Sequence, residues 1–256
     1  MVDLKNPERV RIVESDDRGV RVNHGVVSSK ATPMAVIEIS LGLSPDLSGM
    51  LGNRKVLVIE GGIDDLILRK LSGLMKTSGR TGLADEIYLW IAGSASKTPM
   101  YAAFCIGQKW AASVLLDSDK AGQEAAKKIK EKYLTDVAES DGNQFRVLML
   151  GDAAGIGKTD AEVEDLFAED FYLECVNETY SLAISLSDLP EDGSSAIVDR
   201  LTYVLKQKYN RTLDKKETLK AMFAKFDQWS SADDLPDETG DRAEALFKKI
   251  NACFGL

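Results

Sequence analysis

The sequence predicts an α/β fold in which a mostly parallel sheet is flanked by helices and followed by a helical region. Two observations predict it. Between residues 55 and 167, short apolar segments alternate with segments of helical period, as expected for parallel strands joined by helices. Beyond residue 171 only helical periods occur, and the turns between them are acidic or contain glycine and proline.

The elements can be placed in chain order. Residues 8–14 and 19–22 alternate apolar and polar side chains around a Ser-Asp-Asp-Arg-Gly turn, which predicts a two-stranded hairpin, and no clear pattern follows up to about residue 53. Strands and helices are then predicted in pairs, at 56–59 and 66–75, 87–91 and 100–108, 114–116 and 122–133, and 145–150 and 161–167. Further helices are predicted at 196–209, 216–229 and 243–254. Three regions result: an amino-terminal hairpin and connecting segment (1–54), an α/β domain (55–170) and a helical region packed on it (171–256).

The composition bounds the class of protein. The chain has 256 residues, of which 44% are hydrophobic, so it can bury one substantial core. No apolar run is long enough to span a bilayer and no secretion signal follows Met1, which favours a cytoplasmic protein. Cys105, Cys175 and Cys253 lie among apolar neighbours and are expected to be buried, reduced thiols. The single histidine, His24, argues against histidine-rich metal centres and a histidine general base.

Acidic residues follow three of the predicted strands. They are Glu60 and Asp64 after the first strand, Asp117 and Asp119 after the third, and Glu162, Glu164 and Asp165 after the fourth. Sites form at the carboxyl ends of parallel strands, and residues two apart in an extended backbone point the same way. Crowded carboxylates repel one another unless a cation lies between them, and their hard oxygen atoms suit Mg²⁺ or Mn²⁺.

Each acidic group also has an ordinary structural interpretation. Asp64 can cap a helix, Asp117-Ser-Asp119 can form a solvated turn, and the acids from Glu162 onward can form a favourable first turn of a helix. All three groups occur together, in order and each after a buried strand, which favours one metal site.

These motifs resemble a known family. Glu60-Gly-x-x-Asp64 after one strand and Asp117-x-Asp119 after a later one are typical of TOPRIM domains, which occur in type IA topoisomerases, bacterial primases, recombination proteins and OLD (overcoming lysogenization defect) nucleases. Ile91-Ala-Gly-Ser-Ala-Ser-Lys97, Leu-Leu-Asp117-Ser-Asp119-Lys-Ala-Gly and Glu162-Val-Glu-Asp-Leu-Phe resemble the OLD nucleases in particular. The resemblance covers about residues 55–175 and extends more loosely over the helical region, and it implies a TOPRIM-type sheet.

The resemblance implies cleavage of DNA by two divalent metal ions, Mg²⁺ or Mn²⁺. It assigns six carboxylates as metal ligands: Glu60, Asp64, Asp117, Asp119, Glu162 and Glu164. Glu60 and Asp119 would act directly in catalysis, together with a lysine at a helix start that lies near the scissile phosphate. Lys216 is the predicted lysine; the adjacent Lys215 is the alternative, and a solvated lysine at a helix start is the ordinary interpretation.

OLD proteins carry an ABC-type ATPase domain ahead of the TOPRIM domain, and we recognise none in this chain. Residues 1–50 are similar to the end of that ATPase, so the chain is expected to be the carboxyl-terminal part of an ATPase-nuclease. Its net charge of −9 is unusual for a DNA-binding protein. Metal ions in the acidic site, and DNA contacts made by the missing part, would account for that charge.

One segment mimics the phosphate-binding loop of nucleotide-binding proteins. Gly155-Ile-Gly-Lys-Thr159 lies after a predicted strand and before a predicted helix. Asp152 stands where that motif needs glycine, and its carboxylate would oppose phosphate. A nucleoside triphosphatase therefore ranks below a nuclease.

A second alternative is a TOPRIM module that binds DNA without cutting it, as recombination mediators do. Such modules can manage with an incomplete acidic set, whereas all six candidate ligands are present here. The chain is too short for the strand-passage domains of a topoisomerase, and no template-binding apparatus of a primase is recognisable.

Overall fold

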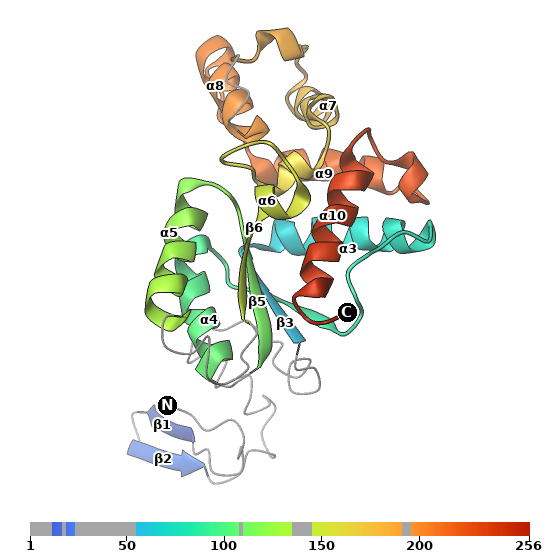
Figure 1. Cartoon of the computed structure of the whole chain (residues 1–256). Helices are drawn as coiled ribbons and strands as arrows, with labels where there is room; N and C mark the ends of the chain where they lie inside the picture. The colour runs from blue at the N-terminus through green and yellow to red at the C-terminus, as the bar shows by residue number, and fades with distance from the viewer. Residues whose placement is uncertain (1–11, 17–18, 24–54, 108–109, 135–144, 191–195) are drawn as a thin grey trace. The chain divides into compact units, whose positions relative to one another are not determined.

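The computed structural model describes residues 12–16, 19–23, 55–107, 110–134, 145–190 and 196–256 (Figure 1). Contacts divide the chain into two compact units, Met1–Gly52 and Asn53–Leu256. In the first unit, β1 (Ile12–Asp16) pairs antiparallel with β2 (Gly19–Asn23). This confirms the predicted hairpin; residues 8–11 and the patternless stretch 24–53 lie outside the described residues.

A four-stranded parallel sheet forms the centre of the second unit. Its strands are β3 (Lys55–Ile59), β4 (Ile87–Ile91), β5 (Ala111–Leu116) and β6 (Arg146–Met149), arranged in the order β4-β3-β5-β6. Residues 56–59 of β3 are fully buried, because the central strand is covered on both faces and so carries an unbroken apolar run. The α/β fold class with a parallel sheet is therefore confirmed.

Helices cover both faces of the sheet (Figure 1). One face carries α4 (Thr98–Gly107) and α5 (Lys120–Ile129), which continues as a π-helical turn (Lys130–Leu134). The other face carries α3 (Gly62–Thr77) and, against it, α10 (Thr239–Ala252) from the end of the chain. Three more helices follow the sheet: α7 (Glu169–Tyr180), α8 (Ile197–Tyr209) and α9 (Lys215–Phe226).

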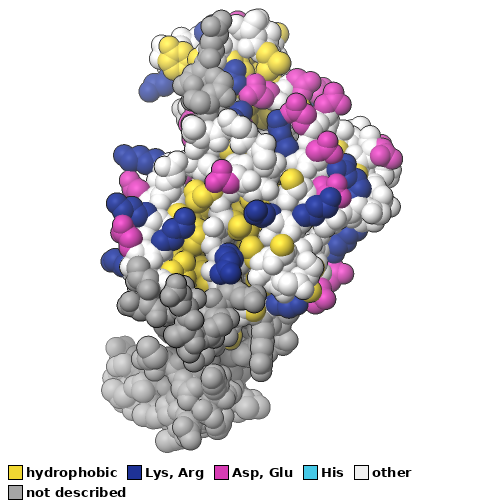
Figure 2. All heavy atoms as spheres, in the orientation of Figure 1, with side chains coloured by type: hydrophobic (Ala, Val, Ile, Leu, Met, Phe, Trp, Pro, Cys, Tyr) yellow, Lys and Arg dark blue, Asp and Glu magenta, His cyan; other side chains and the backbone are white. Residues whose placement is uncertain are grey.

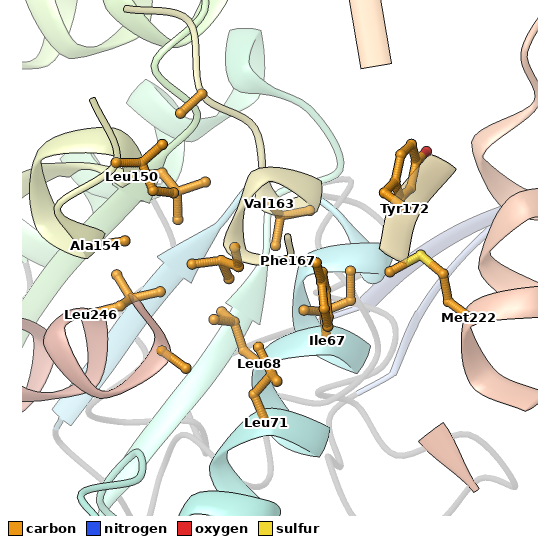
Figure 3. Packing of buried hydrophobic residues seen from close by; sticks show 14 of the residues in the cluster. Ile67, Leu68, Leu71, Leu150, Ala154, Val163, Phe167, Tyr172, Met222 and Leu246 are labelled. Carbon is orange, nitrogen blue, oxygen red and sulfur yellow. The ribbon is translucent and has the colours of Figure 1, made fainter. Parts of the chain in front are cut away.

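The sheet and the later helices share one hydrophobic core. Figure 3 shows Ile67 and Leu68 of α3 near Phe167, with Leu246 of α10 and Met222 of α9 on either side. All five side chains are at most 1% exposed. The ring of Phe167 also stacks on Phe226, with 5.4 Å between ring centroids, so α9 is held against the segment that follows the last strand.

Two predicted elements differ from the structure, one in where it ends and one in kind. The strand predicted at 145–150 ends at Met149, because Leu150 begins a short helix, α6 (Leu150–Ala154), which Gly155 ends in the left-handed conformation (φ 69°). Gly adopts that conformation without strain. The helix predicted at 161–167 is instead one 3₁₀ turn, η4 (Val163–Leu166).

The shorter elements are η2 (Ala95–Lys97), η5 (Leu186–Asp188) and η6 (Ala232–Asp234), each a single 3₁₀ turn. Among the described residues, no helix has both the length and the apolar character needed to cross a membrane.

Candidate functional site

A cavity of about 320 Å³ opens at the carboxyl ends of β3, β4 and β5. It is lined by Glu60, Gly61, Gly62, Ile63, Asp64, Gly93, Ser94, Asp117, Val163, Glu164, Lys215 and Lys216. Four of the six predicted ligands therefore line one cavity. The other two, Asp119 and Glu162, lie close enough to raise the pKa of Glu60 by charge repulsion.

Glu60 and Asp64 come from the turn between β3 and α3. The Glu60 side chain reaches across to β5, where its Oε1 accepts a hydrogen bond from the backbone N–H of Asp117 at 3.0 Å. Asp64 Oδ2 accepts from the backbone N–H of Gly61 at 2.8 Å and so caps α3. Asp64 thus has both a place in the cavity and the capping role that was its ordinary interpretation.

Asp117 and Asp119 flank Ser118 between β5 and α5. Asp117 lines the cavity, whereas Asp119 is the N-cap of α5, with Oδ1 accepting from the N–H of Gly122 at 2.7 Å. A β-carbon at Gly122 would lie 2.0 Å from the carbonyl oxygen of Asp117. Only glycine fits there, so the Asp-Ser-Asp-Lys-Ala-Gly spacing is required by the backbone.

The acids of the third group, Glu162, Glu164 and Asp165, point in different directions in the structure. Glu164 and Asp165 are adjacent and each is 2% exposed; Glu164 lines the cavity, while Asp165 binds Lys158 outside it, at 2.6 Å. A 3₁₀ turn advances about 120° per residue, so neighbouring side chains point in different directions. Glu162 precedes the turn as its N-cap.

Lys215 is the lysine whose ammonium group lies among the acids. Its Nζ is 2.6 Å from Glu162 Oε2 and 3.4 Å from Glu164 Oε2. The predicted residue, Lys216, also lines the cavity but is exposed, and its backbone N–H donates to Asp214, the N-cap of α9. The ion pairs thus single out the alternative, Lys215, as the lysine in contact with acids.

The sequence contains a signal for this choice. Leu219, Met222 and Phe226 form the buried face of α9, and they lie four, seven and eleven residues after Lys215. That spacing places Lys215 on the same helix face as the buried residues, and places Lys216 about 100° away from it.

Burial and mutual repulsion disfavour the charged form of these acids. Desolvation raises the pKa of Glu60 to about 7 despite the hydrogen bond from Asp117, and the nearby carboxylates add to the shift. Desolvation likewise raises the pKa of Glu162 to about 7, with Lys215 opposing it. The pKa of Asp117 is raised well above its usual value by burial and by Asp64 and Glu60. Cations would relieve this repulsion.

The donor atoms fit a divalent metal, although they are not yet arranged around one. Among the described residues, no three Asp, Glu, His or Cys side chains already form a set that could hold a metal ion. Glu60, Asp64 and Asp119 are turned toward backbone N–H groups, and Glu162 toward Lys215. The donors are all carboxylate oxygens, which are the hard ligands that Mg²⁺ and Mn²⁺ prefer.

The segment that mimics a phosphate-binding loop is used differently. The predicted strand before it is present as β6, but the short helix α6 separates β6 from this segment, and the 3₁₀ turn η4 follows in place of the predicted helix. Lys158 Nζ lies 2.6 Å from Asp165 Oδ1 and 2.8 Å from Glu169 Oε1. Its side chain is 12% exposed, and these two carboxylates neutralise its charge inside the protein.

The raised pKa of Glu60 predicts a pH-dependent effect of Glu60→Gln on stability. The folded-state pKa of about 7 exceeds the usual 4.5, so this group's contribution to stability is complete below pH 4.5 and is lost as the pH rises through 7. Glutamine mimics the protonated acid. In EDTA, the variant should unfold like wild type at pH 4.5 and be about 1 to 2 kcal/mol more stable at pH 8, after allowance for solvent screening.

Urea denaturation at several pH values measures this difference. Asp85→Asn, at a carboxylate that is 94% exposed and outside the cavity, is the control for removal of a negative charge elsewhere. A difference in unfolding free energy between Glu60→Gln and wild type that does not change with pH would contradict the raised pKa of Glu60.

Fold and site together define an α/β protein with a carboxylate-rich cavity at the carboxyl edge of a parallel sheet. No family model matches the chain, and no curated protein matches it. Two solved structures are similar to it, both of the C-terminal region of the Xanthomonas campestris pv. campestris OLD protein. One has 14% sequence identity and a TM-score of 0.39, covering 80% of this chain and 97% of that chain. The other has 13% identity and a TM-score of 0.36, covering 80% and 98%.

Both structures come from the family that the sequence motifs resemble.

Proposed function

We propose that this chain is the nuclease part of an OLD-family ATPase-nuclease and that it cleaves the phosphodiester backbone of DNA with Mg²⁺ or Mn²⁺. The observation that carries the proposal is the gathering of acids from the ends of β3 and β5 and from η4, with Lys215, around one cavity at the carboxyl edge of the sheet. The experiment that tests it is metal-dependent cleavage of plasmid DNA.

The acids would hold the metal ions. The proposed ligands are Glu60, Asp64, Asp117, Asp119, Glu162 and Glu164. Bound divalent ions supply positive charge and lower the pKa of water, which is what phosphodiester hydrolysis requires. The protein's contribution is to bring the carboxylates together and to keep them partly out of water, so that they favour a cation strongly.

Lys215 would neutralise negative charge on the scissile phosphate. Its ammonium group lies beside Glu162 and Glu164, so it can reach a phosphate bound next to the same acids. A fixed positive charge stabilises the transition state because charge on the phosphate oxygens is concentrated there. Lys216, exposed at the edge of the cavity, would contact the DNA backbone beside the scissile bond.

Most of the DNA affinity would come from outside this site. On the face drawn in Figure 2, Lys and Arg side chains are interspersed with Asp and Glu, and the net charge is −9. DNA binding depends on phosphate neutralisation. An amino-terminal ATPase domain of the full-length protein, as in the OLD family, is the proposed source of the missing contacts.

Purified protein is expected to nick or linearise supercoiled plasmid in the presence of Mn²⁺ or Mg²⁺. The acids need a bound cation to act, so EDTA should abolish cleavage and added metal should restore it. Agarose gel electrophoresis measures the products. A metal-loaded preparation that binds DNA and never cuts it would favour the alternative of a DNA-binding module without nuclease activity.

A further inference from the structure

We propose that Lys158, in the segment that mimics a phosphate-binding loop, is a positioning residue for the acidic site. Acting through Asp165, it holds the turn at residues 162–166 so that Glu164 faces the cavity and Glu162 lies beside it, against Lys215. This inference rests on the proposed function, since it assigns a role toward the same metal site.

A buried ion pair connects Lys158 to that turn. Lys158 Nζ lies 2.6 Å from Asp165 Oδ1, and the two side chains are 12% and 1% exposed. A carboxylate this deeply buried needs a paired charge, and Lys158 is the cation whose ion pair supplies it. The same ammonium group contacts Glu169 at 2.8 Å, and Arg200 donates two hydrogen bonds to Glu169, so the network extends to α7 and α8.

Asp165 in turn organises the backbone beside the ligands. Its Oδ2 accepts from the N–H of Glu162 at 3.0 Å, and its Oδ1 accepts from the N–H of Ile197 at 3.1 Å. One carboxylate therefore fixes the start of the turn and attaches it to α8. Glu164 is the residue directly before Asp165, so a turn fixed at Asp165 also fixes the direction of Glu164.

The segment that carries Lys158 is also attached to the other acidic turn. Ser118, between Asp117 and Asp119, accepts from the N–H of Gly151 at 2.9 Å through its hydroxyl. Its own N–H donates to the carbonyl of Ala161 at 2.8 Å. Residues 151–161, which we call the strut, are thus bound to the Asp117–Asp119 turn at both ends and to Asp165 through Lys158.

The strut therefore determines the distance between two pairs of proposed ligands, Asp117 with Asp119 and Glu162 with Glu164. Metal affinity depends on the placement of ligands by groups that do not touch the metal, and loss of such groups weakens binding about 10- to 100-fold. The presence of a lysine at this position of the loop is therefore explained without nucleotide binding, because its ammonium group pairs with Asp165 and Glu169.

The test measures Mn²⁺ binding by electron paramagnetic resonance in wild type, Lys158→Gln and Lys158→Arg. Glutamine removes the charge, and arginine keeps it. We expect Lys158→Gln to raise the dissociation constant for Mn²⁺ about tenfold, and Lys158→Arg to recover most of that loss. Lys220→Gln, at a side chain that is 72% exposed, is the matched control and should bind Mn²⁺ like wild type. Circular dichroism checks that each variant is folded.

The outcomes separate this inference from the proposed function. If wild type binds no Mn²⁺, the proposed function fails. If wild type binds Mn²⁺ and folded Lys158→Gln binds it equally well, the positioning role is overturned, as it is by saturable ATP binding that Lys158→Gln loses. If Lys158→Gln does not fold, Ser118→Ala decides: it removes the acceptor for Gly151 without burying a charge, and unchanged Mn²⁺ binding by it would overturn the role of the strut.

Discussion

Lys215→Met is expected to reduce plasmid cleavage by at least about 100-fold while tightening the binding of Mn²⁺. Cleavage falls while metal binding tightens, because the ammonium group favours the first and opposes the second. It stabilises the negative charge that develops on the phosphate, and it competes with a metal ion for Glu162 and Glu164, to which it is 2.6 Å and 3.4 Å away. Methionine keeps an unbranched side chain out to Cε and removes the ammonium group.

Lys216→Met is the matched control, since Lys216 is adjacent on the same helix and lacks a carboxylate contact among the described ion pairs. It should weaken DNA binding modestly and leave Mn²⁺ affinity unchanged. Calorimetric titration with Mn²⁺ and plasmid cleavage, carried out on both variants, provide the comparison. Wild-type cleavage by Lys215→Met together with lost cleavage by Lys216→Met would return the catalytic role to Lys216, as the sequence pattern first suggested.

Asp119→Asn and Asp119→Ala should both lose cleavage by orders of magnitude but differ in stability. Asp119 is at once a proposed metal ligand and the N-cap of α5, where its Oδ1 accepts from the N–H of Gly122. Asparagine caps a helix as well as aspartate does, whereas alanine costs about 1 kcal/mol. Neither neutral side chain replaces an anionic ligand.

Urea denaturation and plasmid cleavage together distinguish the two roles. Asp214→Ala, which removes the cap of α9, is the control for the loss of a cap without the loss of a ligand. If Asp119→Asn cleaves like wild type and only Asp119→Ala is destabilised, Asp119 is a cap and nothing more.

The sequence predicted the sheet well because its two central strands, β3 and β5, are buried on both faces. A strand covered on both sides appears in the sequence as a short, continuous apolar run, and residues 56–59 and 114–116 have that form. The acids that end these strands could be predicted for the same reason. Parallel strands bring their carboxyl ends to one edge whatever the rest of the fold does.

The predictions from sequence were wrong at two short segments, where contacts with other parts of the fold decide the local structure. Leu150 continues the apolar run of β6, yet it begins α6, because Gly151 must approach Ser118 closely: a β-carbon there would lie 3.0 Å from the Ser118 hydroxyl. The segment from Ala161 to Phe167 has a helical period but forms only the single turn η4. The backbone N–H of Glu162 donates to the Asp165 carboxylate, which also accepts from the N–H of Ile197 in α8, so a side chain takes the place of a continuing helix.

The sequence by itself determined the fold class, the order of strands and helices, and the residue types gathered at one edge of the sheet. Tertiary structure decided that Glu164 and not Asp165 faces the cavity. It likewise decided that the ammonium group of Lys215, and not that of Lys216, contacts the acids. It also decided that Lys158 neutralises a buried carboxylate. Adjacent residues differ only in direction, and direction depends on how the turn or helix that carries them is packed against the core, here through Phe167 and Phe226.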